Sequence, residues 1–365
     1  MVFGILKDTK RGEFRVICTP SEVREIVANG HEVLAQAGCG VGAGFEDVAY
    51  LAAGARVVHS AAEIFARSDM VAKVKELSPE EYTLLRKGQI LLGCLHPAAN
   101  PREVDALLAS ECIAFTAEDS HRHGSPNCEA AGKQGALFGL ESMLTINGGK
   151  GKFVGGFAGA PAMRVLILGG GLVGQSATQV LDALGAKCTV MDIDFGVLRR
   201  IGERFGGRVE TALCSREAIA ARLPYTDMVL NCVKWPKERR DFLIDRAMLA
   251  LMERGSVLVD ISNDAPGAIE SSRPTPHDAP RYVEGGVVHF CVANIPSAVA
   301  HSSSVAYAAA MLPMILSILS HGVKNTCQRD AFWRKSLVAY HGTLTHAETA
   351  LIQKRPWRTP AEAFS

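Results

Sequence analysis

Short apolar segments alternate with segments of helical periodicity from residue 2 to about residue 300. In the first third of the chain, each apolar run has the length of one strand and ends in polar or charged residues. Such runs are typical of parallel strands that helices cover on both faces. We predict strands at residues 2–8, 31–37, 70–76, 89–96 and 112–119. This part of the chain is therefore predicted to be an α/β unit.

Two segments between these strands carry the start and stop signals of helices. In residues 19–30, Thr19 can cap the first turn, Pro20 suits the first helical position, Glu22 completes a capping box, and Gly30 ends the helix. The same signals recur in residues 78–88, at Ser78, Pro79, Glu81 and Gly88. We expect a helix in both segments.

A polar, turn-rich stretch at residues 119–127 predicts a domain boundary. A connecting helix is expected next, at residues 128–146, followed by a loop or hairpin with six glycines at residues 147–162. Residues 304–322 form the most apolar segment, but Pro313 interrupts it and two serines lie within it. We interpret this segment as a buried inter-domain helix rather than a membrane span.

The clearest motif follows the predicted strand Val165–Leu168. Gly169, Gly171 and Gly174 stand in G-x-G-x-x-G spacing, and an amphipathic helix follows them. The first glycine permits a tight turn, the second lets the backbone approach a pyrophosphate, and the third lets helix and strand pack closely. We therefore expect this loop to bind a dinucleotide through Gly169, Gly171, Leu172, Val173 and Gly174.

The next predicted strand ends at Asp192, at the distance from the glycines that a dinucleotide site requires. Its carboxylate would accept hydrogen bonds from the ribose hydroxyls and repel a 2′-phosphate, which favours NAD over NADP. Arg199 and Arg200 follow on the next helix and are interpreted as a solvated face. Two further apolar runs, at residues 226–234 and 255–262, continue a doubly wound sheet.

Length and composition limit the classes of function. A chain of 365 residues is expected to form two domains, and 48% hydrophobic residues make it globular. The balance of 39 basic against 38 acidic residues excludes the field of a nucleic-acid or anionic-membrane binder, so we expect a small-molecule partner. Ten cysteines without a C-x-x-C pair, and no secretory signal, indicate reduced thiols in a cytoplasmic protein. No metal is expected.

Several stretches resemble the alanine dehydrogenase family and the related NAD-binding component of the proton-pumping transhydrogenase. They are "GILKDTKRGEFRVICTP", "VAKVKE", "HPAANP", "NGGKG" and "SSRPTPHDAPRYVEGGVVHFCVANIPSAV". The resemblance implies two Rossmann-like, doubly wound domains joined by long helices, with an NAD domain (residues 124–299) inserted into a substrate domain (residues 1–123 and 300–365). Together with the apolar face of residues 308–319, it also implies a homo-oligomer, with a hexamer expected and a dimer as the alternative.

The resemblance also implies roles for five residues. Arg15 would grip the substrate carboxylate, Lys75 would contact that carboxylate and the carbonyl oxygen, and His96 would be the acid/base catalyst. Asp264 would act beside His96, and Asn294 would contact the substrate or the nicotinamide. Three of them have a plainer reading: a surface ion pair for Arg15, a solvated strand edge for Lys75 and its neighbour Lys73, and a buried core histidine for His96.

The chain departs from the family pattern in five places. One is "DAPGA" at residues 264–268, which replaces the family's glycine-containing stretch after the aspartate. Asn127 and Cys128 stand where Met and Ser are usual, and we assign Asn127 to the substrate and Cys128 to the cofactor. Cys94 replaces an aromatic residue before His96. A polar loop at residues 233–241 replaces a small apolar one, and "SHRHG" adds His121, Arg122 and His123, whose role stays open. These changes are either drift in solvated loops or signs of a larger, more polar pocket.

The resemblance implies NAD-dependent oxidative deamination of an L-α-amino acid to a 2-oxo acid and ammonia, or the reverse reductive amination. Two alternatives remain at this point. One is a related dehydrogenase or imine reductase for a larger polar amino acid, of the lysine or saccharopine type. The other is a non-catalytic NAD-binding regulatory protein, which the presence of Arg15, Lys75, His96 and Asp264 disfavours. The transhydrogenase component itself is disfavoured because its Arg-Gln-Asp loop is missing.

Overall fold

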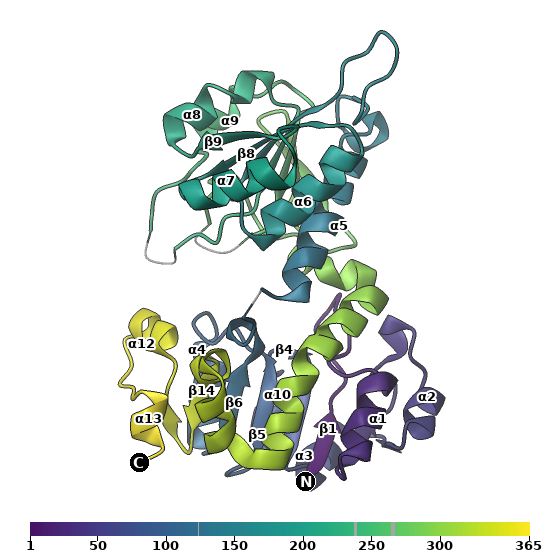
Figure 1. Ribbon diagram of the computed structural model, residues 1–365, viewed down its shortest axis with the longest axis vertical. Coiled ribbons are helices and arrows are strands. Elements are labelled where there is room, and N and C mark those ends of the chain that lie inside the picture. The colour runs from purple at the N-terminus through teal and green to yellow at the C-terminus, as the bar shows by residue number, and fades with distance from the viewer. Residues whose placement is uncertain (123, 237–238, 264–266) are drawn as a thin grey trace. The chain divides into compact units, whose positions relative to one another are not determined.

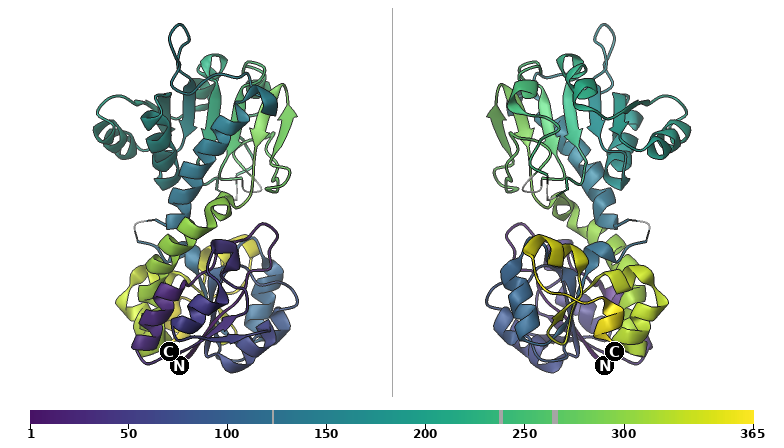
Figure 2. Two further views of the ribbon diagram at one scale, coloured as in Figure 1. Left: turned by 90° about the vertical axis from the view of Figure 1, so that its right-hand side faces the viewer. Right: turned by 90° about the vertical axis from the view of Figure 1, so that its left-hand side faces the viewer.

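The computed structural model describes residues 1–122, 124–236, 239–263 and 267–365. The chain divides into two compact units, coloured by residue number in Figure 1. The first unit consists of Met1–Pro126 and Ala300–Ser365, and the second of Asn127–Val299. The sequence placed these boundaries after residues 123 and 299. Each unit is a sheet with helices on both faces, so the predicted α/β architecture of two doubly wound units is confirmed (Figure 2).

Within the described residues, the first unit has one eight-stranded sheet with the order β15-β14-β6-β5-β4-β1-β2-β3. The strands from β6 to β3 run parallel, whereas β14 is antiparallel to β6. The chain places β2 and β3 on one side of β1 and then returns to place β4 on the other. The bounds are β1 (Val2–Ile5), β2 (Glu32–Gln36), β3 (Arg56–Val58), β4 (Met70–Lys75), β5 (Ile90–Cys94), β6 (Ile113–Thr116), β14 (Leu337–Tyr340) and β15 (Thr343–Leu344).

Two apolar clusters, one on each face, hold helices against this sheet. Buried side chains of α1 (Pro20–Ala28), α2 (Asp47–Ala52) and α10 (Ala300–Arg329) form the first cluster. Those of α3 (Ala61–Arg67), α4 (Pro101–Ala109) and α12 (Ala347–Gln353) form the second. Alternate residues of each strand supply the two faces, as they must in a sheet that is covered on both sides. Short helices α11 (Ala331–Lys335) and α13 (Pro360–Ala363) complete the unit.

One of the two helices predicted from capping signals forms, and the other does not. Helix α1 begins after Thr19 with the predicted capping box to Glu22 and ends at Ala28, just before Gly30. In residues 78–88, by contrast, only the 3-10 turn η2 (Tyr82–Leu84) forms. The carboxylate of Glu81 accepts the Ser78 amide, as a cap would, but it also pairs with buried Lys73. This tertiary ion pair replaces continuation of the helix, so the prediction was wrong there.

Helix α10 is long and apolar enough to cross a membrane by length and composition, although 56% of its most apolar window is buried within the protein. Its buried side chains, among them Tyr307, Met311 and Ile318, belong to the core of the first unit. The backbone breaks at Gly322, where φ is +75°. The predicted buried helix therefore exists, and it buries its apolar face in the first unit.

The second unit, within the described residues, has a seven-stranded sheet of order β12-β13-β11-β10-β7-β8-β9. All strands are parallel except β12. The chain builds outward from β7 through β8 to β9 and then returns to place β10 on the other side of β7. The bounds are β7 (Arg164–Leu168), β8 (Lys187–Asp192), β9 (Glu210–Leu213), β10 (Met228–Asn231), β11 (Val257–Asp260), β12 (Arg281–Glu284) and β13 (Val287–Phe290).

Helices cover both faces of this sheet as well. Helices α5 (Pro126–Ser142), α6 (Leu172–Ala183) and α7 (Phe195–Arg204) pack on one face. Helices α8 (Arg216–Ala220) and α9 (Arg246–Leu249) pack on the other. The predicted connecting helix is thus α5, and the glycine-rich segment that follows it contains a bridge between Phe157 and Ala160.

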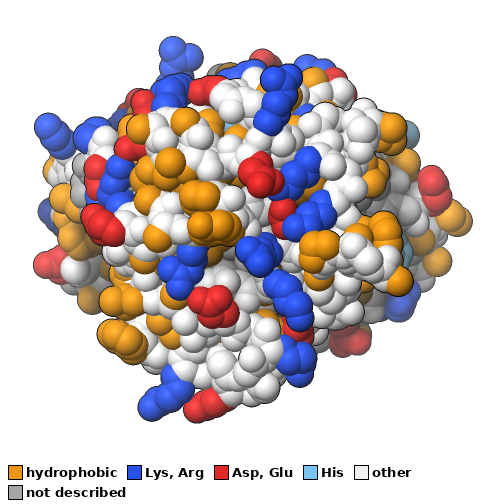
Figure 3. Space-filling view, turned by 90° about the horizontal axis from the view of Figure 1, so that it is seen from above, with side chains coloured by type: hydrophobic (Ala, Val, Ile, Leu, Met, Phe, Trp, Pro, Cys, Tyr) orange, Lys and Arg blue, Asp and Glu red, His pale blue; other side chains and the backbone are white. Residues whose placement is uncertain are grey.

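Charge and cysteine chemistry agree with the composition. On the face drawn in Figure 3, basic and acidic side chains are interspersed rather than gathered by sign. All ten cysteines lie in the described part of the chain and are free thiols, and eight of them are buried.

Candidate functional site

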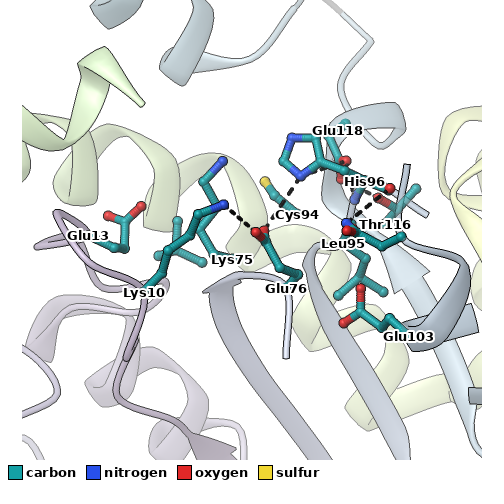
Figure 4. Close-up of polar contacts among 12 residues, drawn as sticks. Lys10, Glu13, Lys75, Glu76, Cys94, Leu95, His96, Glu103, Thr116 and Glu118 are labelled. Carbon is teal, nitrogen blue, oxygen red and sulfur yellow. Dashed lines mark hydrogen bonds and ion pairs between the residues drawn. The ribbon is translucent and has the colours of Figure 1, made fainter. Parts of the chain in front are cut away.

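The first unit gathers charged side chains at the carboxyl edge of its sheet. Ligands of doubly wound sheets bind at this edge, where the strand order reverses, which is between β1 and β4 in this unit. Lys75 is the last residue of β4, His96 follows the end of β5, and Glu118 lies in the 3-10 turn η3 (Ala117–Asp119) after β6. Figure 4 shows these side chains close together. The topology therefore brings two of the predicted site residues, Lys75 and His96, to the place where a ligand is expected.

Arg15 lies in the loop after β1 and is buried, with 4% of its surface exposed. Its Nε donates to Glu13 Oε1 at 2.8 Å and its Nη2 donates to Glu13 Oε2 at 2.6 Å. The same Oε1 accepts the backbone N–H of Arg15 at 2.9 Å. Burial opposes the charge of the guanidinium, but the Glu13 carboxylate outweighs it and raises the pKa of Arg15. The ion pair considered from the sequence therefore exists, but it is buried and not on the surface.

The two lysines of β4 occupy different environments. Lys73 is buried and pairs with Glu81 at 2.8 Å, so a solvated edge is wrong for this residue. Lys75 is partly exposed, and its backbone N–H donates to Asp8 Oδ1 at 3.1 Å. Burial and the nearby Glu13 raise the pKa of Asp8 to about 6, although Lys73 and two backbone N–H groups oppose the shift. Lys75 is thus the last residue of its strand, and its amine lies among the charged side chains at the carboxyl edge of the sheet (Figure 4).

His96 has a strained backbone, with a φ of +45°. Few non-glycine residues adopt this left-handed conformation, and those that do are concentrated at functional sites. Its N–H donates to Glu118 Oε1 at 2.8 Å, which holds the residue in place. The imidazole is 44% exposed, and its Nδ1 lies 3.8 Å from Glu76 Oε2 and 3.6 Å from Glu118 Oε1. A buried core histidine is therefore wrong, because the ring faces solvent between two carboxylates.

Glu76 links His96 to the loop after β1. Its Oε1 forms an ion pair with Lys10. Burial favours the neutral carboxyl, but the neighbouring His96 and Lys10 outweigh it and hold the pKa of Glu76 well below its ordinary value. Glu76 is therefore a carboxylate beside the imidazole at neutral pH.

Behind these groups lies a polar cluster that includes the residue replacing the family's aromatic side chain. The Sγ of Cys94 is 3.0 Å from the hydroxyl of Tyr307, which α10 contributes. Burial and Glu118 raise the pKa of Cys94 to about 12, so it remains a neutral thiol. His121 packs its ring 5.8 Å from that of Tyr307, and its buried Nε2 has no hydrogen-bond partner among the described residues. His123 lies outside the described residues, and Arg122 pairs with Asp330 at 2.8 Å.

The fingerprint loop of the second unit has the geometry that its glycines predict. Gly169 has a φ of +91°, which permits the turn out of β7. Gly171 is the N-cap of α6, and a Cβ added to it meets nothing within 4 Å. A Cβ on Gly174 would overlap the carbonyl oxygen of Gly169, so only glycine allows this approach of helix and strand. Leu172 and Val173 form the first turn of α6, whose N-terminus is the positive end of the helix dipole.

Asp192 ends β8 beside this loop, as the spacing predicts. One carboxylate oxygen accepts the N–H of Gly170 at 2.7 Å, and the other accepts the N–H of Asp194 at 2.9 Å. The side chain is therefore fixed at the carboxyl end of the strand next to the switch point between β7 and β10. Arg199 and Arg200 are exposed on α7, as expected of a solvated face.

The remaining predicted residues of the second unit have mixed outcomes. Asn127 and Cys128, both partly exposed, lie in the first turn of α5. Asn294 has a φ of +86°, and its carbonyl accepts a hydrogen bond from His277 at 3.1 Å. Asp264 lies outside the described residues, so its predicted role stays a prediction.

Sequence reasoning did not identify three residues that shape the first-unit site: Glu13, Glu76 and Glu118. Each lies one or two positions from a residue or strand end that was identified, in "GEFR", "KVKE" and "TAED". An acidic residue at the end of a predicted parallel strand was the available signal for Glu76 and Glu118. No comparable signal existed for Glu13, because its partner Arg15 lies in a loop.

A separate cluster beyond β6 brings ligand atoms of Asp119, His346 and Glu348 within 4.8 Å of one another. Both imidazole nitrogens of His346 already have partners, Asp119 at 2.9 Å and Thr349 at 2.7 Å. His346 is also the N-cap residue of α12. We therefore interpret this cluster as the link that ties the C-terminal segment to the end of β6.

Two doubly wound units, one with a charged carboxyl edge and the other with a Rossmann-type glycine loop, define a two-domain α/β protein of the dehydrogenase type. Family models described as the alanine dehydrogenase/PNT N-terminal and C-terminal domains match residues 4–128 and 136–347. The alanine dehydrogenase of Mycolicibacterium smegmatis is 35% identical over 368 residues, which cover 99% of each chain. The chain belongs to the alanine dehydrogenase/PNT family.

Solved structures agree with this assignment. An L-alanine dehydrogenase structure superposes with a TM-score of 0.91 at 34% identity, covering 97% of this chain and 99% of the other. A transhydrogenase from Sinorhizobium meliloti superposes with a TM-score of 0.79 at 22% identity, covering 95% and 99%. The second likeness shows a shared fold.

Proposed function

We propose that this protein is an NAD-dependent amino-acid dehydrogenase, which interconverts an L-α-amino acid, alanine or a near analogue, with its 2-oxo acid and ammonia. The observation that carries the proposal is the grouping of Arg15, Lys75 and His96 at the carboxyl edge of the first unit, where the strand order reverses between β1 and β4 and where Arg15 and Lys75 both act on Cys94. A guanidinium, an ammonium and an imidazole are the groups that a 2-oxo or 2-amino acid requires. Relatives named alanine dehydrogenase over the full length support it.

The glycine loop fits a dinucleotide. The open space in front of Gly171, the N-terminus of α6 and the fixed carboxylate of Asp192 would hold the pyrophosphate and a ribose. When bound, NAD accepts a hydride from Cα of the amino acid. The carboxylate of Asp192 favours a cofactor without a 2′-phosphate.

The chain's own groups orient the substrate and move protons. Arg15, held by Glu13, and Lys75 bind the substrate carboxylate, and Lys75 also polarises the oxygen of the 2-oxo acid. In the deamination direction, water adds to the iminium carbon of the oxidised substrate, and His96 takes the proton that this water loses. The nitrogen of the carbinolamine then gains a proton from the same imidazole. Ammonia leaves as the C=O bond of the 2-oxo acid forms, and the hydroxyl proton passes back to the imidazole. Asp264 remains the predicted second acid/base group.

Activity with a panel of 2-oxo acids, ammonia and NADH tests this proposal. We expect consumption of NADH with pyruvate or a near analogue, and a decrease in kcat of about 10²-fold or more for His96→Ala. NADH affinity and thermal stability should change little, because the imidazole is exposed and contributes little packing. A destabilised but fully active His96→Ala enzyme would contradict the catalytic role of His96. If no 2-oxo acid of the panel led to NADH consumption, the proposed dehydrogenase activity would be contradicted.

The same panel distinguishes a second candidate substrate class. The unpartnered Nε2 of His121, next to Tyr307 and Cys94, favours a larger amino acid whose polar side chain could bind there. This hypothesis expects a higher kcat/KM for a 2-oxo acid with a polar side chain than for pyruvate. His121→Phe should then remove the preference while leaving turnover of pyruvate in place.

We further propose that the protein is a homo-oligomer, a hexamer first and a dimer as the alternative, and that it is cytoplasmic. The apolar face of residues 308–319 gives the oligomer little support, because Met311, Met314 and Ile318 are buried in the first unit itself. Light scattering at micromolar concentration tests the proposal, and a 39.0 kDa monomer would contradict it.

A further inference from the structure

We propose that Glu76 is a positioning residue, which keeps the proton of neutral His96 on Nδ1 and leaves Nε2 as the base that faces the substrate. The inference rests on the acid/base role proposed for His96. Figure 4 shows the two carboxylates on the Nδ1 side of the ring and the other ring nitrogen on the opposite edge.

Glu118 is the first carboxylate beside the ring, and its oxygens already have donors. Oε1 accepts the backbone N–H of His96 at 2.8 Å, and Oε2 accepts the hydroxyl of Thr116. These bonds stabilise the strained backbone of His96 at a φ of +45°. Glu118 therefore fixes where the residue lies, and its Oε1, 3.6 Å from Nδ1, would have to accept a second hydrogen bond to bind the ring.

Glu76 is the second carboxylate, and one of its oxygens lacks a donor. Oε1 forms the ion pair with Lys10, whereas the buried Oε2 accepts no hydrogen bond from any described residue. A buried acceptor without a donor is unfavourable, because it has lost its hydrogen bonds to water. The ring nitrogen that faces this oxygen is Nδ1 of His96, at 3.8 Å, and a small rotation of either side chain would complete a hydrogen bond.

The consequence is a defined tautomer. In neutral imidazole one nitrogen donates and the other accepts, and the hydrogen bond made by one nitrogen determines the state of the other. A proton on Nδ1 satisfies Glu76 Oε2, so Nε2 keeps its lone pair. Lys10 holds Glu76 ionised and oriented, and the anion stabilises the imidazolium that forms when Nε2 takes a proton.

The test uses the full-length protein labelled with ¹⁵N-histidine, compared with Glu76→Gln and with Glu80→Gln as the matched control. Glu80 is an exposed glutamate of the following segment. The His96 signals are assigned by their loss in His96→Ala. We expect the Nδ1–H tautomer in the wild-type and control proteins, and a mixture or the Nε2–H tautomer in Glu76→Gln.

Kinetics supply a readout that a structural role would not change. Glu76→Gln should lower kcat about tenfold or more with little change in KM. The acidic limb of its pH profile should move to lower pH, because one negative charge beside the imidazolium is gone. The titratable and charged groups labelled around His96 are Lys10, Glu13, Lys75, Glu76, Cys94, Glu103 and Glu118, and all of these except Glu76 remain unchanged in this variant.

If Glu76→Gln does not fold, Lys10→Met replaces it, because Lys10 is half exposed and its loss frees Glu76 to rotate. A smaller change of the tautomer population in the same direction supports the proposal, whereas the acidic limb should now move to higher pH, because a positive charge near the imidazolium is gone. An unchanged tautomer and pH profile in either folded variant overturns it. The tautomer is measured without turnover, so a failure of the proposed dehydrogenase activity is distinguished from a failure of this assignment.

Discussion

The guanidinium of Arg15 and the carboxylate of Glu13 form a two-point ion pair from which solvent is nearly excluded, with side-chain exposures of 3% and 0%. The acid is only two residues from the base, so one loop carries both partners. Through Glu13 the guanidinium plane is fixed before any ligand arrives. Pre-orientation of this kind reduces the entropy that a substrate must lose when its carboxylate binds.

Glu13→Ala tests this relationship. Removal of one partner from a buried ion pair costs about 3–5 kcal/mol, so the melting temperature should fall sharply. Arg15→Lys should instead raise KM for the amino acid about tenfold or more, because an ammonium cannot form the planar fork, with NADH affinity unchanged. The exposed pair Lys87–Glu111 supplies the control, and Glu111→Ala should leave both quantities nearly unchanged. Equal effects of the Glu13 and Glu111 variants would contradict the pre-orientation.

Local signals predicted the elements that local chemistry determines. The Thr19–Glu22 box caps α1, and the glycine spacing after residue 168 gives the β7–α6 turn. The same capping signals failed at residues 78–88, because Glu81 pairs with Lys73 on a neighbouring strand. A sequence does not show which tertiary partner a buried charge will find.

The site was predicted to a similar extent. Lys75 and His96 were identified through the resemblance to the family, and the order of β1, β4 and β5 brings them to one edge. Glu13, Glu76 and Glu118 were missed, because each contributes through a contact, Glu13 with Arg15 and the other two with His96, and not through a motif of its own. The replacement of the family's aromatic residue by Cys94 was visible, but its partner Tyr307 lies 213 positions away in the chain.

The glycines of the fingerprint loop should separate binding from folding. Gly171 has a φ of −67° and open space before it, so Gly171→Ala should fold normally. If a pyrophosphate binds there, the methyl group added by Gly171→Ala should weaken NADH binding about tenfold or more. Gly174→Ala should lower the melting temperature, because its Cβ would overlap the Gly169 carbonyl. NADH titration and thermal melting of both variants test these two predictions. A normal NADH affinity in Gly171→Ala would contradict cofactor binding at this loop.

We expect the choice of cofactor to depend on Asp192. The wild-type protein should bind NADH at least tenfold more tightly than NADPH, because the fixed carboxylate would repel a 2′-phosphate. Asp192→Asn keeps one oxygen to accept a backbone N–H and removes the charge. The variant should therefore bind NADPH more tightly, which reduces the ratio of the NADH affinity to the NADPH affinity. Fluorescence titration of both cofactors measures the ratio. Equal affinities in the wild-type protein would remove the role assigned to this carboxylate.

Glu103, which is 1% exposed beneath the site, should make stability depend on pH. Burial raises its pKa to about 8 from 4.5, reinforced by Glu76 and opposed by the backbone N–H of Leu77. In the folded protein the carboxyl therefore keeps its proton at a pH where the unfolded chain has lost it. Stability then falls as the pH rises from about 4.5 to about 8 and changes no further above that, because both states are ionised.

Glu103→Gln should remove this component of the pH dependence. The amide oxygen can still accept the Leu77 N–H, which Glu103 binds at 2.8 Å, and the amide does not ionise. One pKa unit is equivalent to about 1.4 kcal/mol. Between about pH 5 and pH 8, the free energy of unfolding of the variant should therefore rise by a few kcal/mol relative to that of the wild-type protein. Asp8, whose pKa is raised to about 6, remains in the variant, so the free energy of unfolding should still decrease slightly with pH up to about pH 6. Urea unfolding at several pH values measures the difference. Parallel curves for the variant and the wild-type protein would mean that Glu103 is already ionised when folded.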